Sequence, residues 1–182
     1  MQAWYTPTNP PEQLKVLRFG DRTEEDTIDG VTFIMLFMEL EDHTLRYVAV
    51  EKTPDGFRVD WESFVGWSSV SWEKCLTESI EEPTDFPVTI KIENYFNFGY
   101  SDDTKFICYK LTDPKNWGHC YGYIGIDSPV GQRIHQMMRR QQRQGLDQVK
   151  AVLKLRFEPA GKGRNQVWIV DLVQDGWVRV NP

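Results

Sequence analysis

The segment Ser128–Gly145, SPVGQRIHQMMRRQQRQG, decides the fold of the second half of the chain. Ser128 is a suitable N-cap, Pro129 stands at the first helical position, and Gly145 suits the position after the last turn. The segment therefore predicts one helix with defined ends. Its apolar stripe consists of Val130, Ile134, Met137 and Met138. We expect this stripe to pack against neighbouring strands.

Strand patterns flank the helix on both sides. The strands expected before it are 88–98, 106–111 and 119–126, and those after it are 149–157 and 166–173. Residues 149–157 alternate between apolar and polar side chains, which is typical of a strand with one buried face. The order β-β-β-α-β-β matches the five-stranded barrel called the OB-fold, whose helix lies between strands three and four. The same order also suits an open α+β sheet.

The first half predicts a curved antiparallel sheet. Residues 14–19, 31–40 and 45–52 are expected strands, whereas the acidic stretch 21–29 is an expected loop. Thr53-Pro54-Asp55-Gly56 predicts a tight hairpin, because Pro54 presets φ and Gly56 accepts a positive φ. The chain as a whole is therefore expected to be α+β and β-rich, with an antiparallel sheet followed by an OB-like module.

Residues 81–87, EEPTDFP, predict a linker between two modules, since they contain two prolines and no periodicity. Residues 1–80 are the expected acidic β module and residues 88–182 the expected basic one. Residues 1–86 hold 7 basic and 18 acidic side chains, and residues 87–182 hold 14 and 9. The first module ends in a tryptophan-rich segment, 56–72, which we expect to join the first sheet to its neighbour through Trp61, Trp67 and Trp72.

The composition is that of a soluble globular protein. Of the 182 residues, 40% are hydrophobic and 26% charged, and the 13% of aromatic residues favours strands. No apolar run reaches the length of about 18 residues that a transmembrane helix needs, so none is expected. No signal peptide is visible. Three cysteines without paired spacing do not predict a disulfide framework.

Asp60 and Glu62 are the candidate pocket acids. They flank Trp61 on an expected strand and would share one face, where two carboxylates can act as general acid and base. The alternative is that Asp60 caps nearby backbone and Glu62 is solvated. The three histidines stand far apart, and no cysteine has a visible orienting partner. We therefore assign no catalytic residue, and expect neither a metal nor a cofactor.

Residues 95–123 are rich in aromatic side chains, and the helix carries arginines but no acid. OB-folds bind single-stranded nucleic acid by stacking bases on aromatic side chains beside a basic groove. The candidate binding residues are Tyr95, Tyr100, Tyr109, Arg133, Arg139 and Arg140. Two alternatives stay open. The aromatic residues can build the barrel core, and the arginines can face the acidic first half.

Two resemblances add to this interpretation. The hairpin RYVAVEKTPDGFRVDWESF, within residues 31–65, resembles the closing hairpin of the cone-shaped nuclear-transport-factor-like superfamily; the matching residues are Val48, Val50, Gly56, Phe57, Val59, Asp60 and Trp61. Enzymes of that superfamily place acids and histidines inside the cone.

The whole chain is similar to a group of bacterial proteins of unassigned function, which carry a VDWESFVG-type segment (59–66) and a GWVR-type tail (176–179). Members of that group follow a membrane anchor or export segment, which implies an envelope location; a cytoplasmic location is the alternative.

The sequence thus favours a non-catalytic binding or interaction module, whose partner is another protein or another domain of a longer chain. The first alternative is binding of single-stranded nucleic acid or another anionic ligand by the OB-like half. The second is a small pocket enzyme, a hydrolase or isomerase, that uses Asp60 and Glu62.

Overall fold

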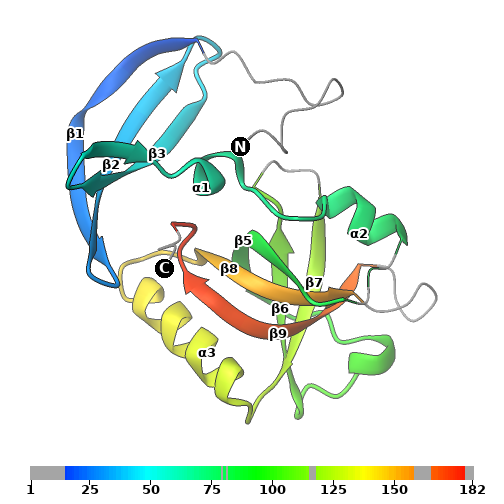
Figure 1. Ribbon diagram of the computed structural model, residues 1–182. Coiled ribbons are helices and arrows are strands. Elements are labelled where there is room, and N and C mark those ends of the chain that lie inside the picture. The colour runs from blue at the N-terminus through cyan, green and yellow to red at the C-terminus, as the bar shows by residue number, and fades with distance from the viewer. Residues whose placement is uncertain (1–14, 79, 81, 115–117, 158–164, 179–182) are drawn as a thin grey trace. The chain divides into compact units, whose positions relative to one another are not determined.

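The computed structural model of the protein describes residues 15–78, 80, 82–114, 118–157 and 165–178. They form two units, whose elements are labelled in Figure 1. The first unit comprises residues 1–65 together with 178–182, and the second comprises residues 66–177. The second unit is thus inserted into the sequence of the first. Strands outnumber helices among the described residues, which confirms the β-rich prediction.

The division lies at residue 65, not at the expected linker 81–87. Strand β5 (Thr84–Glu93) begins inside that stretch, and helix α2 (Trp72–Glu78) before it belongs to the second unit. Up to Val88, β5 pairs only with β8 (Gln148–Phe157), so one side of the strand is unpaired there. A strand with one unpaired side accommodates Pro87. The two prolines of residues 81–87 therefore do not mark a linker, because a strand begins within this stretch.

The first unit contains a four-stranded antiparallel sheet. Its strands, in spatial order, are β1 (Val16–Ile28), β2 (Val31–Leu40), β3 (Leu45–Thr53) and β4 (Gly56–Val59), and helix α1 (Trp61–Val65) follows. The predicted hairpin is confirmed: Thr53 pairs with Gly56, which has a φ of +132°. Thr53 Oγ1 donates a hydrogen bond of 3.1 Å to the carbonyl oxygen of Gly56.

The prediction of an acidic loop at 21–29 was wrong, because β1 continues to Ile28. β1 is the edge of the sheet, and its pairing with β2 is continuous from Thr23 to Ile28. Its side chains here are mostly exposed, so no hydrophobic periodicity marks the strand. The register shifts between Phe19 and Thr23, and charged side chains on an edge strand also discourage pairing with another chain.

Both faces of this sheet bury apolar side chains. On one face, Phe33 and Ala49 form a cluster with Val178. On the other face, Met38 is buried and Phe64 of α1 packs against its cluster. Burying a large apolar side chain stabilises a fold by about 1.5–3 kcal/mol. Val178, which follows the second unit in the sequence, thus contributes to the core of the first unit.

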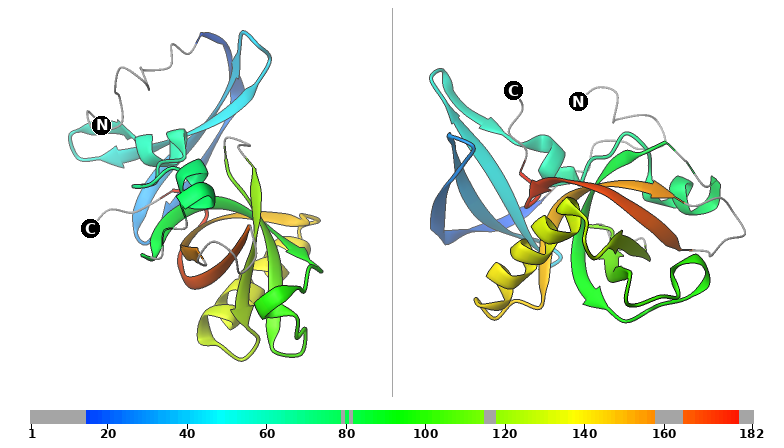
Figure 2. Two further views of the ribbon diagram at one scale, coloured as in Figure 1. Left: turned by 90° about the vertical axis from the view of Figure 1, so that its right-hand side faces the viewer. Right: turned by 90° about the horizontal axis from the view of Figure 1, so that it is seen from below.

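The second unit is built on a closed barrel. Its other strands are β6 (Phe106–Thr112), β7 (His119–Gly125) and β9 (Gln166–Asp175), and the order around the barrel is β5-β6-β7-β9-β8. β7 and β9 run parallel, and the other neighbouring pairs are antiparallel. Closure of the sheet contradicts the open-sheet alternative. Figure 2 shows the same ribbon from two further sides.

Alternating side chains fill the barrel. The inward set includes Val88, Ile90, Tyr109, Leu111, Cys120, Ile124, Leu153, Leu155, Val167 and Ile169. Gly122 leaves room for side chains of the neighbouring strands: a Cβ there would lie 2.7 Å from Leu111 Cδ1 and 3.0 Å from Ile169 Cδ1. The interior is close-packed, so a side chain at this position would force its neighbours to move.

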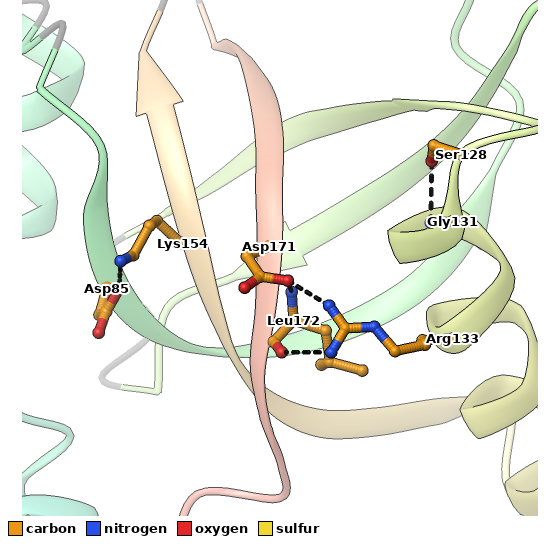
Figure 3. Close-up of polar contacts among 7 residues, drawn as sticks. All are labelled: Asp85, Ser128, Gly131, Arg133, Lys154, Asp171 and Leu172. Carbon is orange, nitrogen blue, oxygen red and sulfur yellow. Dashed lines mark hydrogen bonds and ion pairs between the residues drawn. The ribbon is translucent and has the colours of Figure 1, made fainter.

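Helix α3 (Pro129–Gln142) connects β7 to β8 and has the predicted start. The Oγ of Ser128 accepts a hydrogen bond of 3.0 Å from Gly131 N, as Figure 3 shows. Ile134, Met137 and Met138 are buried in the barrel core. The helix therefore packs its apolar stripe onto the barrel and leaves its polar face to solvent. Within the described part of the chain, no helix has the length and apolar character to span a membrane.

Candidate ligand-binding surface of the barrel

Strand pairing places aromatic side chains in rows on the outside of the barrel. Cys108, Tyr123 and Trp168 are neighbours across β6, β7 and β9. Lys110, Tyr121 and Gln166 form the next row. Successive side chains of a strand point to opposite faces, so residues 108, 110, 121 and 123 share the outer face, whereas Tyr109 and Leu111 point inward. We call the outer face of β6, β7 and β9, together with the loop residues that pack on it, the outer aromatic surface. Its aromatic members are Tyr95, Phe96, Tyr100, Phe106, Tyr121, Tyr123 and Trp168.

The centre of the outer aromatic surface is covered by the loop 94–105, which contains a short 3-10 helix (Phe98–Tyr100). Tyr100 lies parallel to Tyr123 with ring centroids 4.2 Å apart, and its ring meets Phe106 edge-on at 5.3 Å. Tyr123 has no exposed area and Tyr100 is 9% exposed. This centre is a second small core rather than an open surface.

Polar contacts fix the loop over this centre. The Tyr123 hydroxyl donates a hydrogen bond of 2.5 Å to the carbonyl oxygen of Tyr95. Gln166 Nε2 donates to the Tyr123 hydroxyl at 2.9 Å and to the carbonyl oxygen of Asn97 at 3.2 Å. Burial raises the pKa of Tyr123. The hydroxyl is therefore a neutral donor at physiological pH, and its role is to hold the loop.

One margin of the surface remains accessible. Tyr95 and Tyr121 are half-buried and stack with ring centroids 4.1 Å apart and an interplanar angle of 22°. His119 meets Tyr121 edge-on at 5.5 Å. Lys110 is the direct neighbour of Tyr121 on β6, and no carboxylate among the described residues of the barrel unit forms an ion pair with it. We call Tyr95, Lys110, His119 and Tyr121 the tyrosine ledge.

One acid lies near the tyrosine ledge. Glu93, at the end of β5, pairs in register with Cys108, the neighbour of Tyr123 on the outer face. Burial raises the pKa of Tyr121, and the negative charge of Glu93 raises it further. The ledge therefore offers a flat aromatic pair and a primary amine, with a carboxylate close enough to influence a bound charge.

The three tyrosines expected to bind a ligand lie in three different environments. Tyr109 is wrong as a ligand contact, because it points into the barrel and has no exposed area. Burial raises its pKa to about 12. Tyr95 belongs to the ledge, whereas Tyr100 lies in the covered centre. Tyr121 and Tyr123 share one face of β7, and that face is the outer one.

The helix arginines are not on the tyrosine ledge. α3 contacts β9, β8 and β7 through side chains of the barrel core, whereas the outer aromatic surface is a separate cluster. Figures 1 and 2 show α3 and the loop 94–105 on different sides of the barrel. The structure therefore does not combine the tyrosines and the arginines into one groove.

Two of these arginines have partners on β9. Arg133 Nη2 forms an ion pair with Asp171, and its Nη1 donates to the carbonyl oxygen of Leu172 at 3.4 Å (Figure 3). Arg140 Nη2 lies 2.6 Å from Asp175 Oδ2. Both acids belong to the barrel unit, so these two arginines pair within their own unit rather than with acids of the first half.

Asp60 and Glu62 do not share a strand face, because β4 ends at Val59 and α1 begins at Trp61. Asp60 Oδ1 accepts a hydrogen bond of 3.2 Å from Ser63 N, and Asp60 N donates to the carbonyl oxygen of Ala49 at 2.8 Å. The carboxylate therefore caps α1, as one of the two sequence interpretations proposed. Glu62 stands in the first turn of this helix, where an acid interacts favourably with the helix dipole.

The three thiols are poor nucleophiles, and the described residues contain no metal cluster. Cys75, Cys108 and Cys120 are buried free thiols. Burial raises the pKa of all three, that of Cys75 to about 11. A neutral buried thiol is a poor nucleophile. In the same part of the chain, no group of three histidine, cysteine or acidic side chains is placed to hold a metal ion.

Sequence reasoning missed His119, Lys110 and Trp168. His119 and Lys110 become relevant only through the pairing of β6 with β7, and Trp168 only through the parallel pairing of β7 with β9. A scan against protein-family models, a search of curated proteins and a search of solved structures each found no match to this chain.

Proposed function

We propose that residues 66–177 form an OB-fold and that the protein is a non-catalytic binding protein, which uses the tyrosine ledge to bind single-stranded nucleic acid. Strand order supports the fold assignment. Five strands close in the order β5-β6-β7-β9-β8, and the helix lies between the third and fourth. An OB-fold has this number of strands in a Greek-key barrel.

The position of the ledge supports the functional assignment. OB-folds bind oligonucleotides on strands two and three and on the loops between strands one and two and between strands four and five. β6 and β7 are strands two and three of this barrel, and the loop 94–105 connects strands one and two. The single observation that carries the proposal is the accessible Tyr95–Tyr121 stack on this face, with His119 beside it.

The chemistry of the ledge suits unpaired bases. Stacking of a base on an aromatic ring contributes about 1–3 kcal/mol and does not require a particular base. Lys110 pairs with Tyr121 across β6 and β7, so its long side chain can reach a phosphate next to a base stacked on Tyr121. Glu93 opposes this attraction, and one lysine gives a small electrostatic contribution. We therefore expect moderate affinity, little sequence preference, and preference for single strands over duplex.

The test is a fluorescence anisotropy titration with a labelled oligothymidylate of about 16 nucleotides and with a duplex of the same length. Tyr121→Ala should weaken binding of the single strand about tenfold or more. Tyr47→Ala is the matched control, because Tyr47 is an exposed tyrosine of the first unit. Binding should also weaken between about 50 mM and 200 mM salt. No binding at micromolar protein, or equal effects of the two substitutions, would contradict the proposal.

A further inference from the structure

The outward face of α3 carries a stripe of four long polar side chains. Gln132, Gln136, Arg139 and Arg143 are spaced by three or four residues, so they lie above one another on one side of the helix. All four are exposed. Arg143 is the residue at the end of the helix and continues its helical backbone. We call these four residues the arginine stripe.

The stripe has a positive charge that the barrel does not neutralise. α3 contains no acidic residue. Arg133 and Arg140 are paired with Asp171 and Asp175. Among the described residues of the barrel unit, no carboxylate lies within ion-pair distance of Arg139 or Arg143. Gln136, Arg139 and Arg143 line a shallow depression together with Arg140.

The helix dipole explains only part of this arrangement. Cations in the last turn of a helix stabilise it by about 0.3–1 kcal/mol, and lysine serves as well as arginine in this role. Yet the four Lys or Arg residues of the helix region are all arginines, whereas the strands of the same unit carry four lysines, at 91, 110, 150 and 154, and one arginine, Arg156. Arginine differs from lysine in its planar fork, which binds carboxylates or phosphates through two parallel hydrogen bonds.

We propose that the arginine stripe is a docking surface for an acidic segment of a partner protein. Residues three or four apart on a helix are separated by about 6 Å, so Arg139 and Arg143 match two carboxylates on neighbouring turns of an acidic helix. Gln132 and Gln136 extend the stripe with amide groups that both donate and accept hydrogen bonds. The stripe is separate from the tyrosine ledge, so this proposal does not depend on the ligand proposed for the ledge.

Three features favour an acidic protein segment over nucleic acid at this surface. The stripe has no aromatic side chain on which a base could stack. It has two unpaired guanidinium groups, whereas a nucleic acid presents a continuous row of phosphates. Asp171 and Asp175 stand beside the helix on β9. These carboxylates would oppose a long polyanion more than a short acidic segment that contacts only Arg139 and Arg143.

The experiment uses the full chain, a fluorescein-labelled glutamate-rich helical peptide, and the labelled oligothymidylate. The test variant is Arg139→Gln with Arg143→Gln, which removes two charges and keeps good helix formers. The matched control is Lys110→Gln with Arg156→Gln, which removes two charges elsewhere on the barrel. A third variant, Arg139→Lys with Arg143→Lys, keeps the charge and removes the fork geometry. Circular dichroism and thermal unfolding check that each variant is folded.

We expect the arginine-to-glutamine variant to weaken peptide binding about tenfold or more, and the arginine-to-lysine variant to weaken it by a smaller factor. The control should leave peptide binding unchanged while it weakens oligothymidylate binding. Equal loss of peptide binding in the test variant and the control would overturn the proposal, as would no peptide binding at low salt. Loss of oligothymidylate binding in the arginine-to-glutamine variant, with peptide binding intact, would assign the stripe to nucleic acid instead.

Discussion

Tyr100 lies almost parallel to Tyr123, with an interplanar angle of 4° and ring centroids 4.2 Å apart. The two residues come from different elements, the loop 94–105 and strand β7, so the stack anchors the loop to the barrel. Tyr100→Ala should lower the free energy of unfolding of the barrel by about 3 kcal/mol, because it removes a buried ring and leaves a cavity. Urea denaturation measures this change.

The control for this prediction is Phe98→Ala, two residues away in the same loop. Phe98 is 60% exposed, so its truncation should change the free energy of unfolding by less than about 0.5 kcal/mol. If the two substitutions had the same effect, the stack would not be what anchors the loop.

Gly122 should tolerate no side chain without rearrangement. Gly122→Ala should lower the free energy of unfolding by about 1–3 kcal/mol, because the added Cβ would overlap Leu111 Cδ1 at 2.7 Å. Gly99→Ala is the control, since nothing lies within 4 Å of a Cβ built there. Leu111→Val should recover part of the loss when combined with Gly122→Ala. A fully additive double variant would show that this contact is not the cause.

Glu93 should limit the affinity of the tyrosine ledge for an anionic strand. Glu93→Gln should strengthen oligothymidylate binding about twofold to fivefold at low salt, because it removes a negative charge near Tyr121. Fluorescence anisotropy measures the effect, which should shrink as salt is added. Glu82→Gln is a matched control, since Glu82 precedes β5 and is exposed. An equal gain from both substitutions would indicate a general charge effect.

Asp102 should titrate at unusually low pH. Hydrogen bonds from the side chains of Lys105 and Thr104 lower the pKa of its carboxyl from 3.8 to about 2. A lowered pKa means that the ionised form stabilises the turn above pH 3.8 and that this stabilisation is lost as the pH falls through about 2. An NMR titration of the carboxyl carbon measures the midpoint. Lys105→Gln should raise this midpoint; an unchanged midpoint would mean that Lys105 does not contribute.

The three thiols should be unreactive in the folded protein. Cys75, Cys108 and Cys120 are buried with raised pKa values, so the thiolate that reacts with a disulfide reagent is scarce at neutral pH. A chromogenic disulfide reagent should label no thiol rapidly in native buffer and three in denaturant. Rapid labelling of one thiol in native buffer would reveal local opening around it.

The parts of the fold that local chemistry determines were predictable from the sequence. Ser128 and Pro129 indicated the start of α3, and Thr53–Gly56 indicated the hairpin, because caps and tight turns depend on adjacent residues. The edge strand β1 was not predictable in this way. Its acidic part is held by backbone pairing with β2 and not by buried side chains, so the hydrophobic pattern carries no signal.

The site was less predictable than the fold, because it depends on non-local pairing. In residues 106–111 only Lys110 is polar, so alternation gives a single indication of whether Cys108 or Tyr109 points inward. Asp60 illustrates a different difficulty. The same residue type suits a catalytic pair and a helix cap, and only the end of β4 at Val59 decides between them.

Because Val178 clusters with Phe33 and Ala49, the core of the first sheet can be completed only after the barrel has been translated. The first sheet emerges from the ribosome before the barrel, but Val178, which packs on one of its faces, is translated after the barrel. Domains tend to fold as they emerge, so the barrel has the opportunity to fold while Phe33 and Ala49 are still exposed to water. A translation stop within residues 66–177 therefore affects both units: it truncates the barrel and leaves Phe33 and Ala49 without Val178.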